Sequence, residues 1–345
     1  MVFNFIVLML FFMQTTVTTC SGQDNNLEKI PPLMNAKILK NPEMVRALML
    51  ARKFKEVTFP TSDEQTIHAY FLDRSKRQTP TQTIIFAAGF TPGRKEGMAA
   101  FAHLFEDQPY NMLFFDARGH GNSTGPSHWH PRGLSTYGTV EHQDVIGAIE
   151  YVHRHSHEND IPQDIYLHGI CAGAFHSINA LWHLEQNPQH SHLTQAVKGV
   201  IADSSWDRLT DIANHAIHTG SHKQAHPYVA PLVSLALRTV YNYSFRLPHW
   251  WYNHPLEKKL PQVKTPIFFI HHTEDKLSPH ARMQSVIEKL KKNDPEKHIE
   301  EWAVQKTTSE LTGQEKRSLH GNIHLVAPTE YRERVKSFIE QISDQ

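Results

Sequence analysis

Short, almost wholly apolar runs alternate along this chain with longer stretches in which apolar residues recur every three or four positions. Runs of the first kind are typical of strands buried on both faces of a sheet, and stretches of the second kind are typical of covering helices. The predicted strands are 83–88, 111–115, 164–168, 199–202, 265–271 and 300–304, and the predicted helices are 139–155, 172–185, 279–291 and 329–342. Strands that alternate with helices of this length predict a mostly parallel sheet with helices on both faces.

The chain departs from this alternation in two places. At the start, residues 35–53 have a helical pattern that includes Met44, Leu48 and Leu50, and the runs 54–59 and 66–72 predict two strands joined by a turn. Between the strands 199–202 and 265–271, the segment 206–260 has no clear strand and many aromatic residues: Trp206, Tyr228, Tyr241, Trp250, Trp251 and Tyr252. Those aromatic side chains would either suit an apolar acyl or aromatic substrate or simply pack onto the sheet.

One predicted strand is joined to the next helix by the turn Gly169-Ile170-Cys171-Ala172-Gly173. A Gly-x-nucleophile-x-Gly turn between a strand and a helix is a nucleophile elbow, which forces its central residue into a strained backbone conformation. The central side chain then projects from the end of the sheet, beside the positive end of the helix. Here it is a cysteine. The alternative interpretation is a small buried thiol in a tight packing turn.

Three further blocks stand in order around this turn. Ala88-Gly89-Phe90 ends the strand 83–88, Asp116-Ala-Arg-Gly-His-Gly-Asn-Ser123 follows the strand 111–115, and the segment 270–279 follows the strand 265–271. Together with the elbow, these blocks resemble the α/β-hydrolase superfamily over residues 54–342. The chain differs from the family pattern at two positions, since Cys171 stands where serine is usual and Ala88 where histidine is usual. A cysteine nucleophile makes the chain similar to dienelactone hydrolases and to bile-acid acyltransferases.

The resemblance implies a triad of Cys171, His320 and Asp275. Cys171 would be the nucleophile, His320 its base, and Asp275 the acid that fixes the tautomer of the histidine. The backbone N–H groups of Phe90 and Ala172 would form the oxyanion hole.

Alternatives remain open for two of these roles. Ser318-Leu-His320-Gly-Asn-Ile-His324 contains two histidines, and His320 is preferred because a His-Gly pair before the last helix resembles the family pattern. Two other residues are alternatives to Asp275 as the acid. Glu274 is its neighbour in the sequence, and Asp203 follows strand six, where some hydrolases of this type carry the acid. Within the second block, Asp116, Arg118 and His120 are expected to stabilise their own loop through hydrogen bonds.

The expected architecture is therefore an α/β-hydrolase fold with a mostly parallel sheet, helices on both faces and a helical lid between strands six and seven. We divide the chain into a signal peptide (1–20), a linker with an N-terminal helix (21–53) and an α/β-hydrolase domain (54–345), in which residues 206–260 are the lid.

The N-terminal segment bears on localisation. Residues 3–13 form an apolar run too short to span a bilayer comfortably, which favours a secretory signal peptide although no Lys or Arg precedes the run. Val17-Thr-Thr-Cys20 resembles a lipoprotein cleavage box, in which the cysteine becomes the lipidated first residue, although Thr19 is a poor match. We expect an exported protein that is either secreted or held in the cell envelope, with membrane anchoring if Cys20 is lipidated.

Composition excludes several other classes of function. The 345 residues include 35 basic and 35 acidic side chains, so the formal net charge of zero gives no electrostatic reason to expect a nucleic-acid partner. Cys20 and Cys171 are the only cysteines, and cleavage at Cys20 would leave no internal disulfide. A metal site is not expected from the histidines between 215 and 226, because Gly220 interrupts their helix and no acidic or cysteine ligand accompanies them. No cofactor is expected either.

Three functions remain for this set of residues. The first is a hydrolase that cleaves a small-molecule carboxylic ester or thioester through an acyl-cysteine intermediate. The second is an acyltransferase that uses the same Cys/His/Asp site, since a thioester intermediate is more prone to aminolysis than an oxyester. The third is a non-catalytic binding protein on a hydrolase scaffold, which the two departures from the family pattern leave open.

Overall fold

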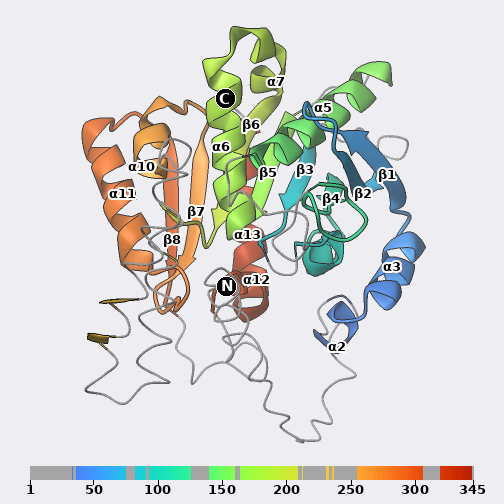
Figure 1. Cartoon of the computed structure of the whole chain (residues 1–345), viewed down its shortest axis with the longest axis horizontal. Coiled ribbons are helices and arrows are strands. Elements are labelled where there is room, and N and C mark those ends of the chain that lie inside the picture. The colour runs from blue at the N-terminus through green and yellow to red at the C-terminus, as the bar shows by residue number, and fades with distance from the viewer. Residues whose placement is uncertain are drawn as a thin grey trace, which may run out of the picture.

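The computed structural model describes residues 36–74, 82–90, 93–125, 140–159, 164–208, 255–305 and 319–343, together with residues 33, 212, 231–232 and 235–236 (Figure 1). The expected signal peptide and nearly all of the expected lid between 209 and 254 lie outside these residues. No helix in the described part of the chain is both long and apolar enough to cross a membrane.

A single eight-stranded sheet runs through the described residues, in the order β1-β2-β4-β3-β5-β6-β7-β8. β2 pairs with both of its neighbours, β1 and β4, in antiparallel orientation. All the other neighbouring strands in the sheet pair in parallel. The predicted mostly parallel sheet is confirmed. The strands are β1 (Lys55–Pro60), β2 (Thr66–Leu72), β3 (Gln82–Ala87), β4 (Asn111–Phe115), β5 (Asp164–Ile170), β6 (Val197–Asp203), β7 (Ile267–His272) and β8 (Ile299–Val304).

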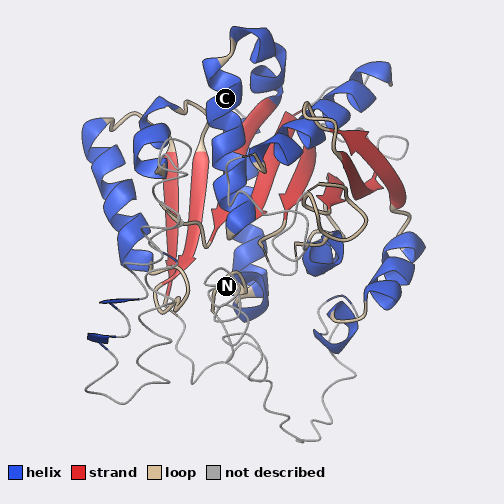
Figure 2. Ribbon diagram, in the orientation of Figure 1, coloured by secondary structure: helices blue, strands red, loops and turns tan. Residues whose placement is uncertain are grey.

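Helices cover both faces of this sheet, as predicted (Figure 2). The described helices are α2 (Ala36–Leu39), α3 (Pro42–Ala51), α4 (Ala99–Leu104), α5 (His142–Glu158), α6 (Ala172–Gln186), α7 (Ser191–Ala196), α10 (Leu256–Lys259), α11 (His280–Asn293), α12 (Ile323–Val326) and α13 (Pro328–Ser343), with 3-10 turns at η3 (Lys95–Met98), η4 (Pro188–His190) and η5 (Leu260–Gln262). One core contains side chains of α5, α6 and α11, and the other contains side chains of α3, α4 and α13.

The strands supply both cores because successive side chains of a strand point to opposite faces. Ile85 and Leu113 pack in the first core, whereas their neighbours Phe86 and Phe114 pack in the second. Phe86 and Phe114 stack with ring centroids 4.4 Å apart. This two-sided burial explains why the parallel strands are apolar at nearly every position.

The N-terminal helical pattern forms two helices instead of one. Pro42 begins α3, and the side chain of Asn41 caps it by accepting a hydrogen bond from Met44 N at 3.2 Å. Val45 and Met49, one helical turn apart, are fully buried, whereas the predicted Met44 and Leu50 are 46% and 39% exposed. Leu48, the third predicted position, is partly buried against the second core, so the sequence pattern located the helix and one side chain of its packed face.

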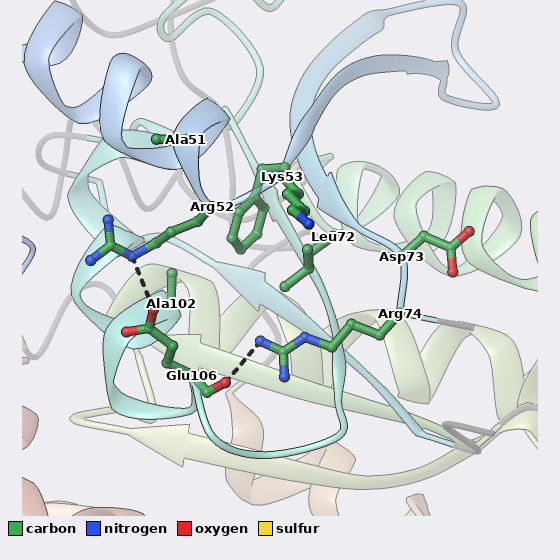
Figure 3. A pocket seen from close by; sticks show the side chains of 9 residues that line it. Ala51, Arg52, Lys53, Leu72, Asp73, Arg74, Ala102 and Glu106 are labelled. Atoms are coloured by element: carbon green, nitrogen blue, oxygen red, sulfur yellow. Dashed lines mark hydrogen bonds and ion pairs between the residues drawn. The ribbon is translucent and has the colours of Figure 1, made fainter. Parts of the chain in front are cut away.

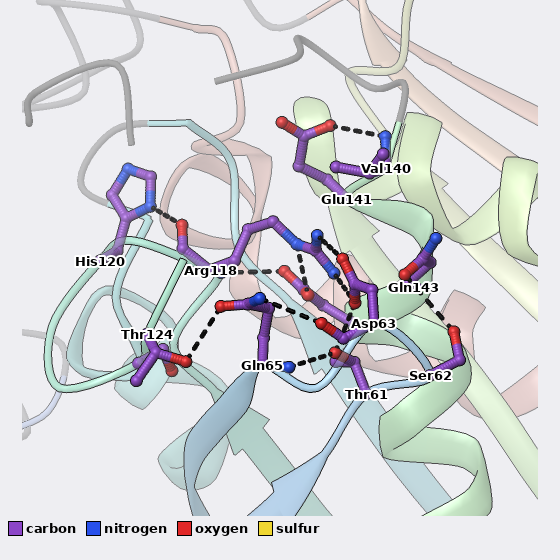
Figure 4. A network of polar contacts seen from close by, with 12 residues as sticks. Thr61, Ser62, Asp63, Gln65, Arg118, His120, Thr124, Val140, Glu141 and Gln143 are labelled. Carbon is purple, nitrogen blue, oxygen red and sulfur yellow. Dashed lines mark hydrogen bonds and ion pairs between the residues drawn. The ribbon is translucent and has the colours of Figure 1, made fainter. Parts of the chain in front are cut away.

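The loop after β4 is held by buried charges, as predicted for Asp116 and Arg118. Lys95 Nζ donates to Asp116 Oδ2 at 2.7 Å, and Arg118 Nε donates to Asp144 Oδ1 at 2.8 Å. The guanidinium of Arg118 also reaches Asp63 in the β1–β2 turn, with Nη1 2.6 Å from Oδ2 (Figure 4). These contacts connect the loop to α5 and to the sheet edge. His120 Nδ1 lies 3.0 Å from Arg118 O and bonds within the loop.

Arg118→Met should lower the free energy of unfolding by about 3–5 kcal/mol, because it leaves the buried carboxylate of Asp144 without its cation. The matched control is Arg46→Met, since Arg46 pairs with Glu56 on the surface and such exposed pairs contribute little. Urea unfolding of both variants measures the difference. Equal, small losses would contradict a structural role for the Arg118 network.

Candidate active site

Cys171 lies between β5 and α6 in the strained backbone conformation that an elbow requires. Its φ of 56° and ψ of −115° are unfavourable for a residue with a side chain. Both flanking glycines are needed, since a Cβ on Gly173 would lie 2.0 Å from Ala87 O and one on Gly169 would lie 2.4 Å from Ala174 N. The backbone N–H of Cys171 donates to Asp203 O at 2.8 Å. A tight packing turn alone gives no reason for this strain at Cys171, which is half-buried.

The turn after β3 packs directly against this elbow. A Cβ on Gly89 would lie 3.1 Å from Cys171 Cβ and 3.5 Å from Cys171 Sγ, so only glycine allows the turn to approach so closely. Phe90 follows Gly89, and Ala172 follows Cys171 at the start of α6. The two backbone N–H groups expected to form an oxyanion hole therefore belong to adjoining turns beside the sulfur.

His320 and Asp275 are in contact, because they follow the neighbouring parallel strands β8 and β7. His320 Nδ1 lies 2.7 Å from Asp275 Oδ2, and Asp275 Oδ1 accepts the backbone N–H groups of Leu277 at 2.8 Å and Ser278 at 2.9 Å. Burial alone would raise the pKa of Asp275, but hydrogen bonds from His271 and His320 and their charges hold this pKa well below its usual value. Asp275 is therefore a fixed carboxylate at neutral pH.

The imidazole of His320 bridges the acid and the sulfur. Burial would lower the pKa of His320, but its charge interaction and hydrogen bond with Cys171, together with the carboxylate of Asp275, raise this pKa well above its usual value. Because Nδ1 faces Asp275, Nε2 is the ring nitrogen that can serve Cys171. The three residues predicted as a triad are thus brought together, in the order sulfur, imidazole, carboxylate.

The alternative residues have other surroundings. The ring of His324 lies 4.4 Å from that of Phe101, and burial lowers the pKa of His324 to about 3, so it is a neutral core residue. The carboxyl of Asp203 accepts from Ser204 Oγ at 2.7 Å and from Tyr331 Oη at 3.0 Å. Glu274 is exposed. Burial and contacts therefore favour His320 and Asp275 over these alternatives.

A second histidine on the acid was not anticipated from the sequence. His271, at the end of β7, donates from Nε2 to Ser278 O at 2.7 Å, and the same nitrogen lies 3.4 Å from Asp275 Oδ2. It thus supports the loop that carries the carboxylate. The sequence pointed to this contact only through the position of His271, four residues before Asp275. In a chain with 26 histidines, that spacing is too weak a signal to identify a functional residue.

Aromatic rings form a wall next to the elbow. Phe90 stacks on Trp206 and Trp206 on Phe175, each with ring centroids 5.6 Å apart, and the ring of His176 lies 5.8 Å from that of Phe90. Trp206 is the first residue of the expected lid, while the other lid aromatics lie outside the described residues. The wall gives the neighbourhood of the sulfur an apolar side.

A cavity of about 450 Å³ lies beside the start of β4, away from the carboxyl ends of β5 and β7 where the triad lies. Two of its three cations are already engaged: Arg52 Nε lies 3.6 Å from the Glu106 carboxylate, and Arg74 donates to Glu106 O at 3.0 Å (Figure 3). We assign this cavity no chemistry. Among the described residues, no group of three or more His, Cys, Asp or Glu side chains is arranged to hold a metal ion.

Comparison with known proteins gives matches in structure but none in sequence. No family model matches the chain, and the comparison with curated proteins found no match. An esterase of Pyrococcus furiosus, Pf2001, is 20% identical with a TM-score of 0.57, covering 84% of this chain and 92% of its own. A bacterial membrane phospholipase A is 14% identical with a TM-score of 0.55, covering 90% and 93%. The acylaminoacyl peptidase of Pyrococcus horikoshii is 19% identical with a TM-score of 0.52, covering 84% and 41%.

The chain therefore has the α/β-hydrolase fold, as the order of its motifs predicted. At these identities the similarity extends to the fold alone. The activity must be argued from the residues of this chain.

Asp275→Asn should slow alkylation of Cys171 by iodoacetamide at pH 6 by at least about tenfold, a difference of about 1.4 kcal/mol in barrier. Without the carboxylate the pKa of His320 falls, so the imidazole carries less of the positive charge that assists attack by the sulfur. Glu274→Gln is the control and should keep the wild-type rate. If Asp275→Asn also kept the wild-type rate of alkylation, the reactivity of Cys171 would not depend on the carboxylate of Asp275, which would contradict the account.

Proposed function

We propose that this chain is a hydrolase that cleaves a carboxylic ester or thioester of a small molecule through an acyl-cysteine intermediate. The observation that carries the proposal is the sulfur of Cys171 on a strained elbow, within electrostatic reach of an imidazole that is hydrogen-bonded to a buried carboxylate. Strain and buried charge of this kind persist where a site requires them.

In the first half-reaction the sulfur of Cys171 attacks the carbonyl carbon of the substrate. A carbon–sulfur bond forms while the carbonyl electrons move to oxygen, and the N–H groups of Phe90 and Ala172 stabilise the oxyanion. Collapse of this intermediate breaks the bond to the leaving group, which takes a proton from His320 Nε2. The products are the free alcohol or thiol and the acyl-cysteine.

In the second half-reaction water replaces the leaving group. Neutral His320 accepts a proton from the water molecule as its oxygen attacks the thioester carbon. Collapse breaks the carbon–sulfur bond, releases the carboxylic acid product and returns the sulfur and the imidazolium to their starting state. Asp275 keeps the ring in the Nδ1–H tautomer and stabilises its positive charge throughout.

Two further observations support this class of reaction. The structural neighbours include an esterase, a phospholipase and a peptidase, all named for the cleavage of an acyl bond. Phe90, the half-buried ring of the aromatic wall, would suit an apolar acyl group beside the sulfur, whereas Trp206 and Phe175 support it from the core. Because an apolar leader-like segment precedes the domain, we place this reaction outside the cytoplasm.

Acyl transfer is the second candidate, and the cysteine itself favours it. A thioester intermediate reacts with amines more readily than an oxyester does, so an amine could compete with water at the same site. Partitioning of product between free acid and amide, measured with increasing amine at constant ester, separates the two reactions.

The proposal predicts a burst of about one equivalent of p-nitrophenol when p-nitrophenyl acetate or butyrate is mixed with the protein. Cys171→Ala should abolish the burst, and Cys171→Ser should leave weak turnover because serine depends wholly on the base. His320→Ala should lower turnover by at least about a hundredfold, whereas His324→Ala, checked for folding by circular dichroism, should lose less than about tenfold. Wild-type turnover in both Cys171 variants would refute the acyl-cysteine intermediate, whereas a wild-type protein with neither burst nor turnover would favour a binding protein.

A further inference from the structure

The segments that carry the three residues of the proposed triad all form hydrogen bonds with residues at the end of β6. The N–H of Cys171 donates to Asp203 O at 2.8 Å, and Ser204 N donates to Ile270 O of β7 at 2.8 Å. The hydroxyl of Ser204 accepts the N–H of Gly321, the residue after His320, at 2.9 Å. The end of β6 therefore contacts the nucleophile turn, the acid strand and the base turn within two residues.

A fourth contact joins the same segment to the acid itself. Ser278 Oγ donates to Ser205 O at 2.9 Å, while Ser278 N donates to Asp275 Oδ1 at 2.9 Å. Ser278 thus connects the backbone after β6 to the carboxylate that holds His320.

The backbone of Ser204 is strained at this position. Its φ of 54° is in the left-handed region, which a residue other than glycine, asparagine or aspartate rarely occupies. Local strain of this kind persists where surrounding contacts require it. Here the strain turns the Ser204 hydroxyl toward Gly321, whose own φ is 65° and whose Cβ, if present, would lie 2.7 Å from Ile170 Cγ2.

A buried chain of hydrogen bonds fixes which way the Ser204 hydroxyl points. Ser204 Oγ donates to Asp203 Oδ1 at 2.7 Å, which leaves its lone pairs for the N–H of Gly321. Asp203 Oδ2 accepts from Tyr331 Oη at 3.0 Å, and His168 Nε2 lies 2.9 Å from the same Tyr331 oxygen. Because tyrosine has one proton, His168 must donate to it, so α13 and β5 support the carboxylate of Asp203.

We propose that Asp203 and Ser204 are positioning residues that hold the base-bearing turn of His320 in register with the elbow of Cys171. The inference rests on the proposed function, but neither residue takes part in bond making. The carboxylate of Asp203 orients the hydroxyl of Ser204, and this hydroxyl holds the backbone next to His320. Loss of the hydroxyl should therefore displace the imidazole relative to the sulfur. The aromatic wall next to the elbow should not change.

The test is Ser204→Gly, because glycine adopts a positive φ without strain and removes the hydroxyl together with its Cβ. We expect kcat for p-nitrophenyl butyrate to fall at least tenfold while KM changes less than twofold. Alkylation of Cys171 by iodoacetamide should slow by a similar factor, hydrogen exchange in 319–323 should become faster, and the melting temperature should not fall. Ser204→Ala, which keeps the Cβ, should lose kcat to the same extent.

Tyr331→Phe tests the buried end of the chain, because it removes the proton donated to Asp203. Its kcat should fall with KM unchanged. The matched control is Tyr166→Phe: the hydroxyl of Tyr166 also bonds to α13, through Ser343 Oγ at 2.9 Å, but has no contact with Asp203 among the described residues. This control should keep wild-type kcat.

Wild-type kcat, alkylation rate and exchange in Ser204→Gly would overturn the positioning role, as would equal effects of the two tyrosine variants. A wild-type protein with neither a burst nor fast alkylation would overturn the proposed function instead. In that case faster exchange of 319–323 in Ser204→Gly would still show that Ser204 holds this turn, whereas unchanged exchange would remove the structural basis of the inference as well.

Discussion

The left-handed backbone of Cys171 is the constraint on which the rest of the site depends. It places the sulfur at the carboxyl end of β5, and it is tolerated because Gly169 and Gly173 allow the chain to approach β3 and α6 without collision. The same turn is fixed by the hydrogen bond from Cys171 N to Asp203 O. Because the position of the sulfur is fixed in this way, a base can approach it only if the turns after β7 and β8 are also held in fixed positions.

Electrostatics then determines what the sulfur can do. Asp275 is held as a carboxylate by two backbone N–H groups and two histidines, and interactions with Cys171 and Asp275 raise the pKa of His320 well above its usual value despite burial. An imidazole whose pKa is raised in this way suits a thiol nucleophile better than a hydroxyl, because a thiol in general is far more acidic than a hydroxyl. The departure from serine at the elbow is thus consistent with the charges around it.

Much of this could be predicted from local patterns. Apolar runs located the parallel strands because both faces of the sheet are covered, and four motifs in order indicated the fold and placed Cys171 and Asp275. The choice of His320 over His324 depended on family resemblance; the physical difference is that His324 packs against Phe101 while His320 contacts Asp275. Ser204, Tyr331 and His168 could not be predicted, since their contacts join segments more than a hundred residues apart and leave no periodic signal. The two fully buried positions of α3, Val45 and Met49, were also missed, because packing against the second core decides which face is buried and apolar spacing alone does not reveal it.

The covalent intermediate is the central claim, and mass spectrometry tests it most directly. Protein mixed with p-nitrophenyl butyrate would be quenched in acid during the first turnover, digested, and searched for an acylated peptide. The account predicts one butyryl group on the peptide that contains Cys171, removable by hydroxylamine and absent after prior alkylation. Release of p-nitrophenol with no acylated peptide, or with the acyl group on another side chain, would contradict it.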